Sequence, residues 1–185
     1  MIERKYLSIE EIISLPTLSD IHISEDGKKV AFVKKTASWQ HNKYKNHIWI
    51  YGKDKEDCNP LTTRDIESTY PLWAPNSKDI AYLSPVGELA DKKNQIFVKL
   101  KEGNSSVQIT DEKEGVSKFK WEPTGKGIYY LAQSKESEVL NKRKELYGDY
   151  LHIGKEYENN CLYYINLDKE VQNDNPEKQH KVVQL

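Results

Sequence analysis

The chain has 185 residues, 37% of them hydrophobic, with four Trp and twelve Tyr. This is enough apolar material for a folded core, so the composition excludes an intrinsically disordered protein. Lys and Arg number 28 against 29 Asp and Glu. Because the net charge is close to zero, the chain lacks the overall field that attracts nucleic acid or an anionic membrane surface.

The amino terminus predicts a short helix. Ser8 to Glu11 has the Ser-x-x-Glu form of a capping box, and Pro16 ends the helix. Ile9, Ile12 and Ile13 share one helical face, and we expect them to cover an end of the domain; a frayed arm is the alternative. The segment holds no apolar run of the length that a secretion signal needs.

No other stretch of the chain approaches the length of a membrane span, so we expect no membrane partner. The two cysteines, Cys58 and Cys161, lie in unlike sequence contexts. This favours reduced thiols over a disulfide framework. We therefore expect a cytoplasmic protein.

An internal repeat dominates the rest of the sequence. The stretch ISEDGKKVAFV at 23–33 returns as WAPNSKDIAYL at 73–83 and as WEPTGKGIYYL at 121–131. Trp73 lies 50 positions after Ile23, and Trp121 lies 48 positions after Trp73. A period of this length is typical of propeller or solenoid units, which are stabilised by stacking on one another.

Each unit decomposes into four short strands. The first two are joined by a polar turn, for which Asp26-Gly27 predicts a type I′ hairpin. Asn76-Ser77 and Thr124-Gly125 occupy the matching places. The third strands alternate around β-branched or aromatic residues at 47–53, 95–101 and 161–167, and the first two units end at Leu61-Thr62 and Ile109-Thr110.

These units predict an all-β fold, a partial β-propeller of about three four-stranded antiparallel blades. Its expected limits are 1–17 for the amino-terminal arm and helix, 18–63 for blade 1, 64–111 for blade 2 and 112–185 for blade 3. Blade 3 departs from the period through two insertions, at 134–157 and 168–180. The first predicts a short, marginal helix at 137–146, and its Lys142-Arg143-Lys144 run either docks a partner or is simply solvated. The second is polar and predicts a flexible loop.

The residues that carry chemistry form no recognisable active site. A nucleophile elbow needs Gly-x-Ser-x-Gly, whereas Gly115-Val116-Ser117 continues as Lys118-Phe119. None of the five histidines has a serine partner that sequence can assign: His22, His41, His47, His152 and His180. His41 and His47 are six apart in an expected loop, without a cysteine nearby to complete a zinc set. We expect no catalytic, cofactor-binding or metal-binding residue.

The repeats resemble a known family. WAPNSKDIAYL and WEPTGKGIYYL are similar to the Trp-Ser-Pro-Asp-Gly-Lys element of TolB-type propeller blades. With the leading Ser-x-x-x-Ile-x-x-Leu-Pro segment, the stretch NKYKNHIW at 42–49, the blade endings and Gly115-Val116-Ser117-x-Phe119-x-Trp121, the chain resembles the amino-terminal propeller of the prolyl oligopeptidase family. The closest branch is that of the acylaminoacyl peptidases, and the resemblance covers about residues 8 to 185.

In that family a propeller of about seven blades caps a separate α/β-hydrolase domain and admits peptides to a Ser-Asp-His triad. The resemblance implies that this chain is the first part of such a gate, truncated within or just after a closing strand at Lys181 to Leu185. Its partners would be the hydrolase domain and, through the parent protein, peptides.

Two other functions stay open. A non-enzymatic TolB-like propeller, assembled from several copies of this chain, would bind another protein. Another propeller enzyme would place its active residues in blade loops, with Trp39, Tyr44 and Trp121 lining a pocket. Because three blades leave two blade faces uncovered, we also expect self-association through these faces.

Overall fold

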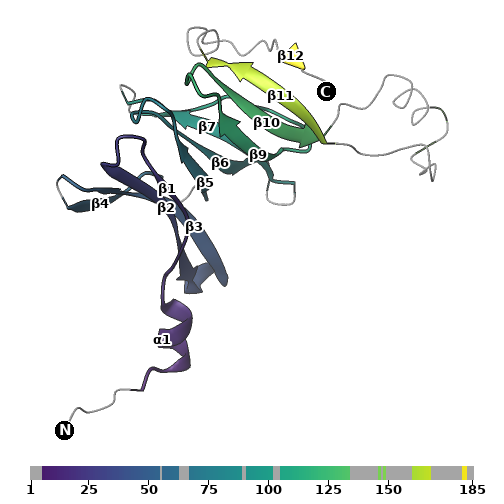
Figure 1. Cartoon of the computed structure of the whole chain (residues 1–185). Coiled ribbons are helices and arrows are strands. Elements are labelled where there is room, and N and C mark those ends of the chain that lie inside the picture. The colour runs from purple at the N-terminus through teal and green to yellow at the C-terminus, as the bar shows by residue number, and fades with distance from the viewer. Residues whose placement is uncertain are drawn as a thin grey trace.

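The computed structural model describes residues 6–54, 56–62, 67–88, 91–101, 105–133, 146, 148 and 160–167, and the backbone of 181–182. Its strands form three separate four-stranded sheets, ordered β1-β2-β3-β4, β5-β6-β7-β8 and β9-β10-β11-β12. All strand pairs are antiparallel. The expected all-β partial propeller of three four-stranded blades is confirmed (Figure 1).

The elements follow the repeat along the chain. They are α1 (Ile9–Ser14), β1 (Thr17–Ile23), β2 (Lys29–Ser38), the 3-10 helix η1 (Trp39–His41), β3 (Lys43–Gly52), β4 (Asp57–Pro60), β5 (Thr69–Trp73), β6 (Ile80–Val86), β7 (Lys93–Lys99), β8 (Ser106–Gln108), β9 (Val116–Trp121), β10 (Gly127–Gln133), β11 (Asn160–Asn166) and β12 (Lys181–Val182). We call the sheets blades 1, 2 and 3 in chain order.

The first two strands of every blade are joined by the same turn. In blade 1 the N–H of Ser24 donates to the carbonyl of Lys29 at 2.9 Å, and the N–H of Gly27 donates to the carbonyl of Ser24 at 2.8 Å. The same two bonds recur in the other blades. In blade 2 the N–H of Ala74 donates to the carbonyl of Asp79, and the N–H of Ser77 donates to the carbonyl of Ala74. In blade 3 the N–H of Glu122 donates to the carbonyl of Gly127, and the N–H of Gly125 donates to the carbonyl of Glu122. One turn geometry is therefore built from three different sequences.

The expected type I′ geometry at Asp26-Gly27 is wrong. A type I′ turn needs positive φ at both central residues, whereas only Gly27, with φ +67°, is in the left-handed region there. The Asp26 carboxylate instead accepts hydrogen bonds from the Ser24 hydroxyl and the Lys28 N–H. These local bonds stabilise a loop that is longer than a two-residue hairpin turn. A tight turn over residues 24–27 comes first, and β2 begins after it.

The blades pack face to face through apolar side chains. Between blades 1 and 2 the buried contacts form two small clusters, around Ala31, Trp73 and Ile80, and around Val33, Ile48 and Tyr82. Blades 2 and 3 share a larger core. Its buried members are Ala81, Leu83, Ile96, Val98, Ile109, Val116, Phe119, Ile128, Tyr130, Ala132, Tyr163, Ile165 and Leu167. Burial of apolar surface between sheets is the main stabilising term here, as in stacked repeat proteins.

The Leu-Thr and Ile-Thr endings close blades 1 and 2 in the same way. The hydroxyl of Thr62 accepts a hydrogen bond from the N–H of Ile48 at 3.1 Å, and that of Thr110 accepts one from Ile96 at 2.8 Å. Both threonines are buried. In both blades the third strand extends beyond the end of the fourth strand, and the threonine hydroxyl provides the acceptor for an N–H that has no fourth-strand carbonyl.

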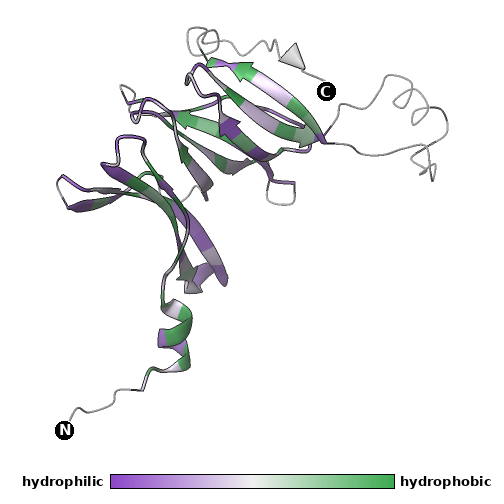
Figure 2. Cartoon of the chain, viewed as in Figure 1, coloured by the Kyte–Doolittle hydropathy of each residue, from purple (hydrophilic) through white to green (hydrophobic). Residues whose placement is uncertain are grey.

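Helix α1 forms with the expected capping box. The N–H of Glu11 donates to the Ser8 hydroxyl at 3.1 Å, and the Glu11 carboxylate accepts from the Ser8 N–H at 2.9 Å. Its isoleucines are all exposed, Ile9 most of all at 72%. The expectation that they cover an end of the domain is wrong for the described residues. α1 lies below blade 1, away from the other two sheets (Figure 1), and Figure 2 shows that the helix carries both hydrophobic and hydrophilic residues.

Two further expectations concern local structure. His47 lies within β3 rather than in a loop, because β3 extends back to Lys43. The insertions at 134–157 and 168–180, with the Lys142-Arg143-Lys144 run, lie outside the described residues apart from Leu146 and Gly148. Within the described part of the chain, no helix is long and apolar enough to cross a membrane.

Candidate functional site

Two pockets mark opposite ends of blade 2. Strand β7 connects them, because its first residue Lys93 lines one pocket and its last residue Lys99 lines the other. Seven residues of β-strand span roughly 20 Å. We call them the Lys93 pocket and the Lys99 pocket.

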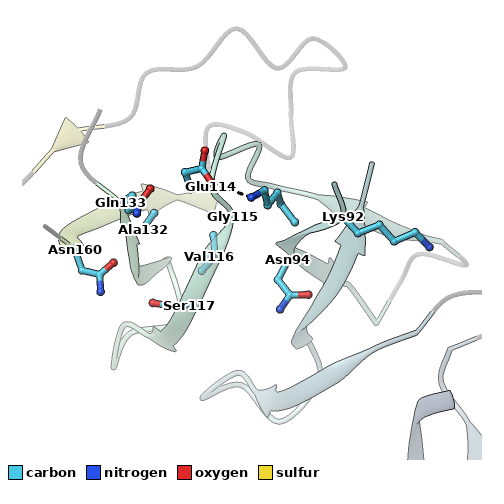
Figure 3. A pocket seen from close by; sticks show the side chains of 10 residues that line it. Lys92, Asn94, Glu114, Gly115, Val116, Ser117, Ala132, Gln133 and Asn160 are labelled. Carbon is cyan, nitrogen blue, oxygen red and sulfur yellow. Dashed lines mark hydrogen bonds and ion pairs between the residues drawn. The ribbon is translucent and has the colours of Figure 1, made fainter. Parts of the chain in front are cut away.

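The Lys93 pocket has a volume of about 340 Å³ and lies between blades 2 and 3 (Figure 3). It is lined by Lys92, Lys93, Asn94, Glu114, Gly115, Val116, Ser117, Ala132, Gln133 and Asn160. These residues come from the beginnings of β7, β9 and β11 and from the end of β10. Gln133 and Asn160, which line this pocket, are the described residues on either side of the first insertion in the sequence.

One glycine keeps the two blades close at the Lys93 pocket. Gly115 has φ +76°, and a Cβ at this position would lie 3.0 Å from the carbonyl oxygen of Asn94. A side chain would therefore meet both backbone strain and a clash with β7. The Gly115 of the sequence signature serves close packing between blades.

An ion-pair group forms one wall of the Lys93 pocket. The Lys93 ammonium lies 2.8 Å from the Glu114 carboxylate and 3.4 Å from that of Asp91. The hydrogen bonds to Glu114 and Asp91 raise the pKa of Lys93, and the bond to Glu114 has the larger effect. The lysine therefore stays charged. The remaining lining groups include the amides of Asn94, Gln133 and Asn160. Such groups bind polar ligand atoms by hydrogen bonding, but they are not nucleophiles.

The Lys99 pocket, of about 390 Å³, lies at the other end of β7. Its apolar members are Ile50, Pro60 and Leu61. Charged and polar groups make up the rest of the lining: Asp26, Lys28, Lys29, Asp54, Asp57, Asn59 and Lys99, with Gly52. Carboxylates and ammonium groups are interspersed, so the pocket has no single sign of charge.

Two of the described histidines take part in hydrogen bonds within or between the blades. The Nδ1 atom of His22 accepts the backbone N–H of Trp73 at 3.1 Å and joins blade 1 to blade 2. His41 lies in η1 with Nδ1 3.0 Å from the Ser38 hydroxyl, a pair three residues apart in one turn. His152 and His180 lie outside the described residues.

Ser117, in the motif nearest to a nucleophile elbow, donates its hydroxyl to the carbonyl of Leu131 across the sheet. This is a structural bond within blade 3. In the described part of the chain, no three His, Cys, Asp or Glu residues are grouped so as to hold a metal ion.

The three aromatic residues proposed for a loop pocket are not brought together. The Trp39 indole donates to the Ser14 hydroxyl at 3.0 Å and ties α1 to blade 1. The Lys35 ammonium lies 4.5 Å from the centroid of the Tyr44 ring. Trp121 ends β9 and donates its indole N–H to the carbonyl of Leu72 in blade 2 at 3.0 Å. Trp121 is therefore a packing residue between blades, and none of the three lines either pocket.

A buried polar network between blades 2 and 3 was missed in the sequence. The side-chain oxygen of Gln95 accepts hydrogen bonds from the Thr110 hydroxyl and the backbone N–H of Glu112. The side-chain NH₂ of Gln95 donates to the backbone carbonyl of Glu112 at 2.8 Å. The Tyr130 hydroxyl donates to the Glu112 carboxylate at 2.9 Å. The Thr110 ending was the only sequence signal for this network. A satisfied network of this kind fixes how two elements pack.

Comparison with known proteins agrees with this architecture. The family described as the dipeptidyl peptidase IV (DPP IV) N-terminal region matches residues 24–122. An uncharacterized peptidase, YuxL, of Bacillus subtilis is 28% identical over 147 residues, which is 79% of this chain and 22% of that protein. Dipeptidyl-peptidase 5 of Porphyromonas endodontalis is 26% identical over 127 residues, 68% of this chain and 18% of that protein.

Solved structures share the fold. The β-propeller domain of the trilobed protease from Pyrococcus furiosus has a TM-score of 0.59 at 21% identity, covering 83% of this chain and 40% of that one. Pyrococcus horikoshii acylaminoacyl peptidase has a TM-score of 0.61 at 16% identity, covering 85% and 24%. The chain spans only about a fifth of the length of the curated relatives it matches. The expected likeness to peptidase propellers is confirmed, and the chain belongs to the family of dipeptidyl peptidase IV N-terminal regions.

Proposed function

We propose that this chain forms part of the gating propeller of a serine peptidase of the prolyl oligopeptidase family. In this proposal the propeller controls the access of peptides to a separate α/β-hydrolase domain, which supplies the Ser-Asp-His triad. The membership in a peptidase propeller family supports it, as do the curated relatives, which are named as peptidases.

The arrangement of the first strands carries the proposal. β1 and β5 are joined by the bond from the Trp73 N–H to His22, and β5 and β9 by the bond from Trp121 to the Leu72 carbonyl. A side-chain hydrogen bond therefore links the first strand of each blade to that of the next, which is expected of blades arranged around a propeller channel. In this proposal, blades that are fixed to one another keep the channel narrow, so that it admits extended peptides and excludes folded proteins.

We place this function in the cytoplasm. Cys58 and Cys161 are both free thiols in the structure, which suits a reducing compartment.

The test uses two proteins, the 185-residue chain and the product of the complete reading frame that contains it. We expect a fluorophosphonate serine-hydrolase probe to leave the chain unlabelled and to label the complete product. The complete product should also cleave short peptides faster than the same sequences within a folded protein. Substituting Gly115 with Val, which disturbs the blade 2–3 contact, should reduce this size discrimination while probe labelling persists.

A reading frame without a Gly-x-Ser-x-Gly domain would overturn the proposal in favour of a non-enzymatic propeller that binds another protein. Probe labelling of the 185-residue chain itself would also contradict the proposal, because the reactive serine would then lie in the propeller blades.

A further inference from the structure

The two interfaces between the described blades differ at one equivalent place. Cross-strand register identifies it. Lys99 pairs with Ile80, which packs on blade 1, and Ile165 pairs with Ile128, which belongs to the core between blades 2 and 3. Lys99 and Ile165 therefore occupy the same position, each on the face that its blade turns to the preceding one.

Between blades 2 and 3 this place is filled by apolar side chains. Ile165 is 2% exposed and belongs to the shared core, and Leu100 of blade 2 packs against the same core. Val98 and Ile109, also on the blade 2 side, are 1% and 6% exposed. Apolar side chains of both blades therefore meet here and exclude water.

Between blades 1 and 2 the same place is open. Lys99 takes the position of Ile165, and Gly52, 48 positions before Leu100, has no side chain to fill the space. Both residues line the Lys99 pocket. A branched apolar residue and a leucine in one interface thus correspond to a lysine and a glycine in the other, and the Lys99 pocket lies where their volume is missing.

The apolar part of the pocket lining shows what this change costs. Ile50 and Leu61 are only half-buried, whereas their counterparts 48 positions later, Val98 and Ile109, are buried. Apolar surface that stays in contact with water is unfavourable, and a half-buried ammonium beside it is unfavourable as well. Departures from a repeat that lower stability are expected at functional sites.

Two ammonium groups line the pocket without an ion-pair partner. Lys29 comes from blade 1, where its Nζ atom lies 5.1 Å from the centroid of the Trp73 ring, and Lys99 comes from blade 2. In the described part of the chain, neither lysine forms an ion pair with a carboxylate. Both are half-buried, so salt screens their charges less than it screens charges at the surface.

The carboxylates of the lining already have partners. Asp26 accepts the backbone N–H of Lys28, and Asp54 lies 3.8 Å from the Lys28 ammonium. Asp57 accepts a hydrogen bond from the side-chain amide of Asn59 at 3.0 Å. All three carboxylates are exposed and therefore well hydrated. The charge that the pocket has left to offer a ligand is positive.

We propose that the Lys99 pocket binds the carboxyl-terminal residue of a peptide whose last side chain is apolar. The side chain lies on Ile50 and Leu61, and the α-carboxylate pairs with the ammonium groups of Lys29 and Lys99. The volume of about 390 Å³ is within the range of small-ligand pockets. A free amino acid fits less well, because its own ammonium group lies beside the carboxylate and is repelled by the two lysines.

Both walls of this pocket belong to described blades. The proposal therefore applies equally to the 185-residue chain and to a longer propeller that contains it, and it does not rest on the peptidase function.

Titration of the 185-residue chain with N-acetyl-leucine, followed by two-dimensional amide NMR, tests the site. We expect saturable shifts at the amides of Gly52, Leu61 and Lys99, with a dissociation constant in the millimolar range or below. N-acetyl-leucinamide lacks the charge and acetate lacks the apolar group, so each should bind at least about tenfold more weakly. Equal binding of either compound, or equal binding of free leucine, would contradict the proposed ligand.

Two substitutions of Lys99 separate charge from packing. Lys99→Gln should weaken N-acetyl-leucine binding about tenfold and leave the melting temperature nearly unchanged. Lys99→Ile, which introduces the residue of the equivalent interface, should abolish binding and raise the melting temperature, because isoleucine covers Ile50 and Leu61. Circular dichroism shows whether each variant keeps its fold.

The matched control is Lys78→Gln, at an exposed lysine in a turn of blade 2 that lines neither pocket. It should bind N-acetyl-leucine as the unchanged chain does. The absence of saturable shifts in the unchanged chain, or affinity that Lys99→Gln lowers no more than Lys78→Gln does, would overturn the proposal.

Discussion

The side-chain hydroxyl of Ser77 accepts a hydrogen bond at 3.0 Å from the backbone N–H of Asp26, 51 positions earlier. Both residues lie in the equivalent turns of neighbouring blades. Ser77 occupies the left-handed region with φ +56°, where blades 1 and 3 have Gly27 and Gly125. The serine therefore accepts backbone strain in exchange for a bond between blades.

Substitutions at Ser77 separate these two effects. Ser77→Ala loses the bond and keeps the strain, so we expect it to lower the free energy of unfolding by about 1 to 2 kcal/mol. Ser77→Gly loses the bond but relieves the strain, so its effect should be smaller. Urea unfolding monitored by fluorescence measures both. A glycine variant that is less stable than the alanine variant would contradict this account.

The buried threonines that close the blades provide a second test. Thr110→Val removes the acceptor of the Ile96 N–H and the donor to Gln95. We expect a loss of about 1 to 3 kcal/mol, since buried polar groups are left without partners. Thr110→Ser keeps the hydroxyl and serves as the control. Native-state hydrogen exchange should show the Ile96 amide less protected in the valine variant only.

Replacing Trp73 and Trp121, the two tryptophans between blades, with phenylalanine should lower the stability of the protein by different amounts. Trp121 donates its indole N–H to the Leu72 carbonyl, whereas the buried indole N–H of Trp73 has no hydrogen-bond partner among the described residues. Both substitutions make the same change of side chain, but only Trp121→Phe also removes a hydrogen bond. We expect Trp121→Phe to cost about 1 kcal/mol more than Trp73→Phe in thermal unfolding. Equal losses would show that the indole bond adds nothing.

His22 gives the stack a dependence on pH. Burial lowers the pKa of His22 below its ordinary value of 6.5, and the negative charge of Glu25 partly opposes this shift. The unfolded chain then binds a proton more readily than the folded one, so stability should fall as the pH drops below about 6.5. A protonated Nδ1 also loses its bond from the Trp73 N–H.

His22→Asn replaces the ring nitrogen with an amide oxygen that does not titrate. We expect the difference in unfolding free energy between pH 7.5 and pH 5.5 to shrink in this variant, while the other ionisable groups contribute equally to both proteins. An unchanged difference would mean that His22 does not sense pH in the folded state.

The repeat was predictable because its signals are local. Trp73, Trp121 and the threonine endings recur at one period, and alternation marks the strands on either side of them. The type I′ assignment failed because Asp26 is also a side-chain acceptor for its own loop, a choice that Asp-Gly alone does not reveal. The exposure of the α1 isoleucines was not predictable, because a helical pattern shows which residues share a face and not what that face meets.

The contacts between blades were beyond sequence reasoning for a related reason. His22, Gln95 and Glu112 each bond to a residue of another blade or of the link between blades, so their roles depend on how the sheets are placed. Without the cross-strand register, nothing marks Lys99 as the counterpart of a buried isoleucine. The candidate pockets depend in the same way on positions that only the packing of blades brings together.

The shared turn and the near-constant offset of about 50 residues between bonded blades have a consequence for how the chain acquires its structure. Strands pair within each blade through short connections, and each blade then needs only its predecessor as a template. Contacts that are local or limited to neighbours close small loops, so their entropic cost stays low. We expect folding to proceed blade by blade in the direction of synthesis, with each finished sheet nucleating the next.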